Sequence, residues 1–291
     1  MKDLVENSEP SASEPVLSWL RSDLEQRLGF RGAKHTRANN LFTFIMAVLL
    51  TILFYAVIAW LQSSRFSSMF KERGITPYFI VFFSFWSISI LFTKWRKLVL
   101  QREALKLSII PEEAGFVLSP STVDEVLSNL YSAVDDPKQF LLFNRALVAL
   151  SNLRNLGRVT DVDEILRSQA ERDESAMDTS YSLLRGFIWA IPVFGFIGTV
   201  LGLSEAIGAF GGVLGASTEM SEITASLTLV TSGLSTAFET TLEALVAAVA
   251  IQLLLTFLRK SEEEFLDNCD EYCHRHVVNR LRMTPYEQVK E

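Results

Sequence analysis

The chain has 291 residues, of which 49% are hydrophobic and 21% charged, and its formal net charge is −7. It is too apolar for a typical soluble domain, although the charged fraction leaves room for substantial parts outside a membrane. Because the balance is acidic and no basic face is concentrated, direct binding to nucleic acid is excluded as a leading function.

The N-terminal stretch is polar. Residues 1–16 are rich in Ser, Glu and Pro, a composition typical of disorder. Apolar side chains at helical spacing then predict a short amphipathic helix within 17–37 that closes at Gly29. These side chains are Leu17, Leu20, Leu24 and Leu28.

Two uninterrupted apolar stretches, about 41–61 and 75–93, predict the first two membrane spans. About 20 helical residues cross a hydrocarbon core of about 30 Å, so both stretches are long enough. Trp60, Tyr78 and Trp95 lie near their ends, where interfacial aromatic rings prefer to be. We interpret both spans as lipid-facing anchors, the first of them retained rather than cleaved.

The block that follows reads as helical, and no alternating strand pattern of any length is present in it. Thr122 and Glu125 match a capping box, which predicts a helix start. Pro137 stands at an expected first helical position, and Asp161 precedes a further start.

Two long helices are expected to join the membrane to this block. From about residue 163 a helix should run through Tyr181 into the third span, because no Pro or Gly intervenes before Gly186. The tail from Ser261 predicts an amphipathic helix that extends the fourth span.

The third and fourth spans, about 187–210 and 226–258, carry groups that lipid should not meet. Glu205 lies in the third span, and Glu239 and Glu243 lie in the fourth. A carboxylate at mid-membrane costs about 3 kcal/mol, so such residues usually face a bundle interior or an aqueous path. We therefore expect the function to lie in these two helices.

Basic residues predict the orientation. The loop between spans three and four contains no Lys or Arg, whereas Arg65, Lys71 and Arg73 between spans one and two weaken the contrast. The positive-inside rule then favours four spans with both termini in the cytoplasm. The flanking basic residues are Arg27, Arg31, Lys34 and Arg37 before span one, Lys94, Arg96, Lys97, Arg102 and Lys106 after span two, and Arg259 and Lys260 after span four.

Small residues share one face of the third span. Gly195, Thr199, Gly202 and Ala206 follow at spacings of four, three and four, a pattern that lets membrane helices approach closely. Packing is the preferred interpretation of the glycines, whereas Thr199 would place a hydroxyl at the contact. Pro192 is expected to loosen or kink the helix.

One face of the fourth span is too polar to meet lipid. Thr241 points nearly opposite to that face, when the residues are placed at about 100° each. The polar face comprises Thr228, Ser232, Ser235, Thr236, Glu239, Thr240 and Glu243.

The tail also carries Cys269, Cys273 and His276, which could share a helical face and suit zinc. The cysteine spacing is not that of a standard zinc site and a fourth ligand is missing, so reduced thiols without a metal are the preferred interpretation. The sequence has no phosphate-binding glycine loop, nucleophile elbow or HExxH motif, and we expect no enzyme.

The paired motifs of spans three and four resemble the MotA/TolQ/ExbB proton channel family. The segment PVFGFIGTVLGLSEAI at 192–207 is similar to that family's Pro-x-x-G-x-x-GTV-x-G signature, and GLSTAFETTLEALVAAVAI at 233–251 is similar to its last helix. Two spans, a helical block and two pore-forming spans is the MotA-type arrangement.

The resemblance implies an all-α polytopic protein of the bacterial inner membrane, assembled as a homopentamer around two copies of a one-span partner resembling MotB or ExbD. Proton or sodium flow, with no other cofactor, would be converted into rotation or conformational work. The alternative is a non-conducting oligomeric scaffold that binds a cytoplasmic partner. The expected parts are a cytoplasmic segment at 1–40, spans one and two within 41–93, a cytoplasmic helical domain at 94–186, pore-forming spans within 187–258 and a cytoplasmic helix at 259–291.

The resemblance also implies site residues. Thr199 and Thr241 match the family's ion-path hydroxyl positions, whereas the early Glu of ExbB and TolQ is Thr236 here. Further candidates for the ion pathway are Glu239, Glu243, Thr240 and Ser235, and candidates for pore-helix packing are Pro192, Gly195, Gly198 and Gly202.

Overall fold

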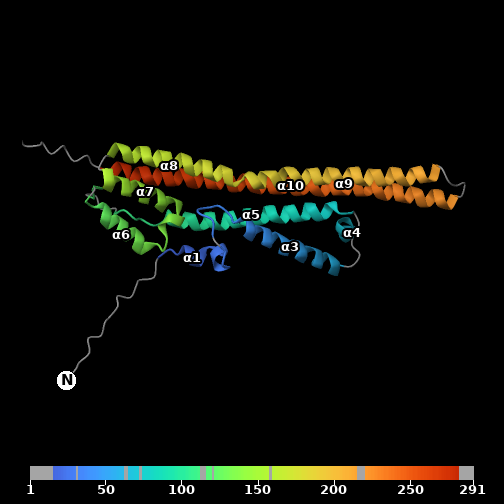
Figure 1. Cartoon of the computed structure of the whole chain (residues 1–291), viewed down its shortest axis with the longest axis horizontal. Coiled ribbons are helices and arrows are strands. Elements are labelled where there is room, and N and C mark those ends of the chain that lie inside the picture. The colour runs from blue at the N-terminus through green and yellow to red at the C-terminus, as the bar shows by residue number, and fades with distance from the viewer. Residues whose placement is uncertain are drawn as a thin grey trace, which may run out of the picture. The chain divides into compact units, whose positions relative to one another are not determined.

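The computed structural model describes residues 16–30, 32–61, 65–71, 74–111, 116–119, 121–156, 159–214 and 220–281. Most of the N-terminal stretch predicted to be disordered, residues 1–15, lies outside them. The described chain contains no strand, only two isolated bridges, so the all-helical prediction is confirmed. Its helices (Figure 1) are α1 (Trp19–Ser22), α2 (Leu24–Arg27), α3 (Asn40–Trp60), α4 (Arg65–Lys71), α5 (Thr76–Ala104), α6 (Val123–Ala133), η1 (Pro137–Gln139), α7 (Leu141–Leu156), α8 (Val159–Ser180), α9 (Ser182–Leu214), α10 (Met220–His276) and η2 (Val278–Arg280).

In the described part of the chain four helical stretches are long and apolar enough to cross a membrane, as the sequence predicts: α3, α5, the α8–α9 segment and α10. The second is longer than expected, because α5 continues past residue 93 to Ala104. Lys94 and Lys97 were interpreted as basic residues that flank this span. Both lie within α5, and their side chains are almost completely buried. The tail prediction is confirmed, since α10 continues unbroken to His276.

The helix expected to run through Tyr181 is interrupted there. The Tyr181 N–H donates to the Asp178 carbonyl, three residues back, and a turn at this residue separates α8 from α9. A tightened turn of this kind needs no Pro or Gly, which is why the sequence did not indicate it. The start of α8 at Val159 also precedes the one expected just after Asp161.

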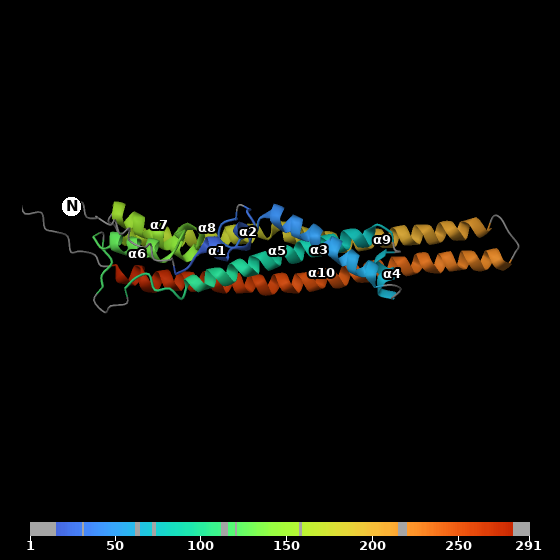
Figure 2. The same ribbon diagram turned by 90° about the horizontal axis from the view of Figure 1, so that it is seen from below.

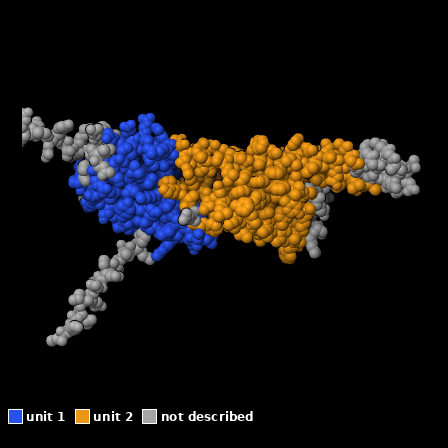
Figure 3. Space-filling model, viewed as in Figure 1, with its two compact units in different colours: residues 1–29, 99–173, 265–291 blue, residues 30–98, 174–264 orange. Residues whose placement is uncertain are grey.

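The chain divides into two compact units, shown in blue and orange in Figure 3. Unit 1 comprises Met1–Gly29, Val99–Asp173 and Phe265–Glu291, and unit 2 comprises Phe30–Leu98 and Glu174–Glu264. Unit 2 therefore holds nearly all of the apolar helical surface that the spans supply.

In unit 2, α5 is the middle helix, since α3 packs on one side of it and α9 on another (Figures 1 and 2). Trp86 of α5 contacts the ring of Phe44 at 5.1 Å and donates through Nε1 to Thr43 Oγ1 at 3.2 Å. On the other side Trp86 lies 4.6 Å from Phe187 of α9, ring centroid to centroid. The interpretation of α5 as a purely lipid-facing anchor is therefore wrong, because half of its apolar stretch is buried.

In unit 1, the N-terminal segment folds differently from the single amphipathic helix expected over 17–37. Two short helices form, separated at Asp23. The buried apolar side chain of this segment is Trp19, which packs edge-on against Phe140 at 5.2 Å. Leu20 and Leu28 are exposed instead. Gly29 does close the segment, with a φ of 81° that favours glycine.

The predicted helix starts in unit 1 are only partly correct. Helix α6 begins at Val123, yet Thr122 makes no capping hydrogen bond with its side chain; the Ser119 carbonyl accepts from the Val123 N–H instead. Pro137 opens the short helix η1, as expected. Helix α7 then carries Arg145, whose buried guanidinium lies 2.7 Å from Asp173.

The two cysteines of the tail are buried free thiols. His276 stacks on Tyr272 at 4.5 Å. Among the described residues no group of three or more His, Cys, Asp or Glu could hold a metal ion.

Candidate functional site

Helices α9 and α10 touch along a line of glycines. An added Cβ on Gly195 would lie 2.5 Å from the Cβ of Ala244, and one on Gly202 would lie 2.6 Å from the carbonyl oxygen of Gly233. The second contact is with backbone, so any larger residue at Gly202 must push the helices apart. We call this contact the α9–α10 seam; it comprises Gly195, Gly198 and Gly202 of α9 with Gly233, Ala237, Thr240, Thr241 and Ala244 of α10.

Pro192 lies off the seam. It lines a shallow pocket with Trp189 and Phe196 on another face of α9, and the helix continues through it from Ser182 to Leu214. Because proline has no N–H, the carbonyl four residues earlier loses its usual helical partner.

The hydroxyl of Thr241 lies in the seam. Its Oγ1 is 3.2 Å from the Gly195 carbonyl oxygen and 3.1 Å from that of Ala237, and it can donate to either. Thr240 beside it is buried and donates to the Thr236 carbonyl at 2.9 Å. Thr199 donates within α9 to the Phe196 carbonyl at 2.5 Å, so the structure does not join it to Thr241 by a hydrogen bond.

The acidic residues of the spans fall into three environments. Ser235 donates to Glu239 Oε1 at 2.9 Å, while Glu205 is exposed on α9. Glu243 instead faces a pocket against α3, α4 and α5. Thr241 therefore points toward α9, and Glu243 points toward the other spans. The sequence pattern predicted that the two side chains lie on opposite faces of α10, but it did not indicate what each face contacts.

The candidate ion-path residues also differ in their position along α9 and α10 relative to the end of α5. An added Cβ on Gly198 would lie 2.5 Å from Thr240 Oγ1 and 3.0 Å from the Oγ1 of Thr76, the first residue of α5. Residues 199–214 extend α9 past this level by about 24 Å at 1.5 Å per residue, and α10 extends with it (Figure 1). Thr199, Ser235 and Glu239 therefore lie at or beyond the end of α5, whereas Thr241 and Glu243 lie alongside it.

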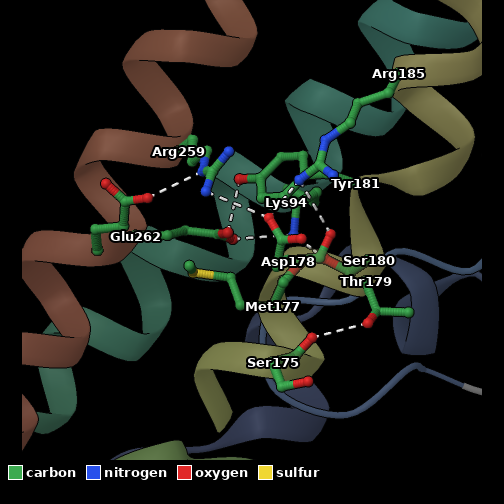
Figure 4. A network of polar contacts seen from close by, with 11 residues as sticks. Lys94, Ser175, Met177, Asp178, Thr179, Ser180, Tyr181, Arg185, Arg259 and Glu262 are labelled. Carbon is green, nitrogen blue, oxygen red and sulfur yellow. Dashed lines mark hydrogen bonds and ion pairs between the residues drawn. The ribbon is translucent and has the colours of Figure 1, made fainter. Parts of the chain in front are cut away.

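A buried polar network connects the other ends of the spans (Figure 4). Lys94 Nζ lies 3.1 Å from Glu262 Oε1, and each side chain is 1% exposed. The same ammonium donates to Ser180 Oγ at 3.0 Å and lies 4.2 Å from the centre of the Tyr181 ring. Tyr181 donates its hydroxyl to Glu262 Oε2 at 2.6 Å, which completes a triangle of α5, α8–α9 and α10.

An exposed layer lies beside this triangle. Asp178 pairs with Arg185 and, at 3.3 Å, with Arg259 (Figure 4). Arg259 also donates to Glu263 at 2.9 Å. Lys97 holds the segment before α3 by donating to the carbonyls of Ala33 and Arg37 at 3.1 and 2.9 Å. No pattern in the sequence predicted this network.

The signal that could have revealed the network is weak. Lys94 follows an apolar run directly, where a flanking charge is ordinary, and Glu262 is the first of three consecutive acids. Nothing in either pattern pairs the two, since the pairing depends on α5 continuing past its apolar part.

A known protein family matches part of the chain. Residues 141–271 match the model of the MotA/TolQ/ExbB proton channel family, a range that begins with α7 and includes all of α8 and α9 and nearly all of α10. No curated protein and no solved structure matched the chain. The matched range contains the whole α9–α10 seam, so the chain is similar to the MotA/TolQ/ExbB proton channel family over residues 141–271.

Proposed function

We propose that this membrane protein is the ion-channel-forming subunit of a motor that converts proton or sodium flow into rotation or conformational work. The family is a channel-type family, and the single observation that carries the proposal is that its match spans the helix pair with the hydroxyl-bearing seam. The transported ion is the only small species that this function requires, and no enzymatic step is part of it.

The seam itself supports an assembly of several chains. Inside one chain the two helices meet at the contact distances of glycine, so no ion can pass between them. A path along Thr199 and Thr241 therefore has to be completed by another chain. The proposed assembly is a homopentamer around two copies of a one-span MotB/ExbD-like partner in the bacterial inner membrane, with both termini of each subunit in the cytoplasm.

The outward surfaces of α9 and α10 fit such an assembly. Trp189, Phe196, Phe238 and Phe257 are all more than half exposed. Apolar surfaces of this kind require lipid or neighbouring helices. Neighbouring subunits would cover part of them and lipid the rest.

In the proposed mechanism an acid on the partner helix takes up and releases the ion next to the hydroxyls. Thr199 and Thr241 would offer hydroxyl oxygens on that path, with Thr240, Ser235, Glu239 and Glu243 as further polar groups. One charge that crosses 100 mV releases about 2.3 kcal/mol, so several passages can drive a conformational cycle.

The test is reconstitution into liposomes with and without a one-span MotB/ExbD-like partner, with proton entry read from an internal pH dye. We expect flux only when both proteins are present, and expect Thr241→Val to reduce it strongly, because that change removes the hydroxyl and keeps the volume. Strong leakage through the chain alone would contradict the coupled motor. Absence of flux with a bound partner would favour the scaffold.

A further inference from the structure

Glu243 lies in surroundings that differ from those of the other acids in the spans. Both of its carboxyl oxygens expose less than 1 Å² each, and neither has a hydrogen-bond partner among the described residues. Glu239, one turn earlier on α10, accepts a hydrogen bond from Ser235. The Glu243 carboxyl group is thus buried, and no described residue donates a hydrogen bond to it.

The carboxyl faces an apolar pocket of about 410 Å³ within unit 2. The walls come from α3, α4, α5 and α10, and no Lys or Arg of the described chain is among the lining residues. Among the described lining residues Ser84 is the other polar one, and its hydroxyl donates to the Ile80 carbonyl at 2.7 Å. The walls include Phe54, Phe70, Val81, Phe85 and Val246.

The charged and titratable neighbours are few. Tyr55 on α3 interacts electrostatically with Glu243. The pocket residues contributed by α4, Met69 and Phe70, are neutral, and α5 contributes no charged residue to the wall. No cation of the described residues therefore compensates an ionised Glu243.

These surroundings decide which ion the carboxyl can take. An ionised carboxylate without a donor in an apolar site is costly, whereas the neutral acid is tolerated. A sodium ion that leaves water needs several oxygen ligands. Among the described lining residues, Ser84 is the one besides Glu243 with a side-chain oxygen, and its hydroxyl already donates to the Ile80 carbonyl. The neighbouring Tyr55 would add a single hydroxyl. A proton needs only the carboxylate itself.

We propose that Glu243 is a proton-binding site within the membrane, placed against α3–α5 and off the α9–α10 seam, and that it takes H⁺ and not Na⁺. The part that this proton plays in ion flow rests on the proposed function; the existence of the site does not.

The experiment is labelling of the full-length protein in lipid vesicles with dicyclohexylcarbodiimide, followed by peptide mass spectrometry. This apolar reagent needs a neutral acid: the acid proton passes to a nitrogen of the carbodiimide, the carboxyl oxygen bonds to its central carbon, and an acyl shift then gives a stable N-acylurea. The step is an addition with no leaving group, so the labelled peptide gains the whole mass of the reagent.

We expect most of the membrane label on Glu243, with a yield that falls by up to about tenfold for each pH unit once the acid ionises. Glu243→Gln should abolish this label. Glu239→Gln, one turn away and bonded to Ser235 in the native chain, should leave it unchanged. Ala247→Phe, which fills the pocket from the same helix, should reduce it.

Several outcomes overturn the proposal. Absence of label on Glu243 at low pH would show that the acid is not neutral or not reachable from lipid, and a label that Ala247→Phe does not reduce would show that access does not run through the pocket. Protection of Glu243 by NaCl but not by KCl would show a sodium site. Because labelling needs neither partner nor flux, label without flux contradicts the motor alone, and flux without label contradicts this site alone.

Discussion

The ammonium of Lys94 shows how strongly one residue can depend on its partners. It is buried at 1% exposure, and Glu262, Ser180 and Tyr181 supply its contacts. Removal of one member of a buried ion pair leaves the other charge uncompensated, which costs far more than the pair gains. The network is therefore expected to hold α5, α8–α9 and α10 together.

Lys94→Met is expected to lower the free energy of unfolding by about 3–5 kcal/mol, because Glu262 is left as a lone buried charge. Thermal unfolding of the detergent-purified protein measures this. Lys106→Met is the matched control, because its pair with Glu103 is exposed and should be worth no more than about 1 kcal/mol. Equal effects of the two changes would contradict the buried network.

Asp135 holds the start of α1 in unit 1. Burial alone would raise the pKa of its carboxyl, but the N–H groups of Trp19, Leu20 and Asp136 and the Ser18 hydroxyl donate to it and leave the pKa below its ordinary value. Since the pKa is lower in the folded state, the stabilisation is fully present above the unfolded value of about 3.9 and is lost as pH falls through the folded value.

Asp135→Ala should therefore lower the free energy of unfolding by about 1 kcal/mol at neutral pH, the usual value of such a cap. The difference from the native chain should shrink below about pH 4, where the native carboxyl takes up its proton. Unfolding temperatures of both proteins between pH 3 and 7 measure it. A difference that stays constant across that range would contradict the role of the charge.

Among the contacts between helices, the α9–α10 seam restricts most strictly which residues can stand at its positions. Gly202→Ala places a Cβ within 2.6 Å of the Gly233 carbonyl oxygen, and is expected to destabilise the hairpin by about 1–3 kcal/mol, in the range of an overpacked core. Gly208→Ala is the control on the same helix, since its Cβ would meet nothing within 4 Å. Thermal unfolding compares them; an equal or larger loss for Gly208→Ala would contradict the seam.

Much of the element scale could be predicted from the sequence. Four apolar stretches give four helices, and the close spacing of Gly195 and Gly202 on one face matches a real contact with α10. The predictions that were wrong have a common cause, which is contact with residues far away along the chain. Trp19 overrides the leucine pattern of the first segment because it has Phe140 to pack against, and Lys94 is buried because Glu262 lies opposite. Such partners lie far away along the chain, where local patterns hold no information about them.

For the candidate site, the sequence indicated which residues are polar but not where they point. The helical wheel separated Thr241 from Glu243, and the structure assigns the first to α9 and the second to the α3–α5 side. Thr76 marks the end of α5 and so separates the candidate residues that lie alongside α5 from those that lie beyond it. Sequence periodicity predicts which face of a helix a residue occupies, but not which part of a neighbouring helix lies beside it. The function of these residues in an ion path stays a prediction.

For the whole molecule, the glycine contacts close the α9–α10 seam within one chain, so an ion path along this seam needs a second chain. The proposed ion flow therefore depends on assembly. In the proposed function several copies of the chain surround a partner helix and offer Thr199 and Thr241 to that helix.

Cryo-electron microscopy of the chain copurified with a one-span MotB/ExbD-like partner tests this proposal. The proposed function predicts five copies around two partner helices, with Thr199 and Thr241 next to the partner's acidic side chain. A monomer or dimer, or a pentamer whose central space holds no partner helix in the copurified complex, would contradict it.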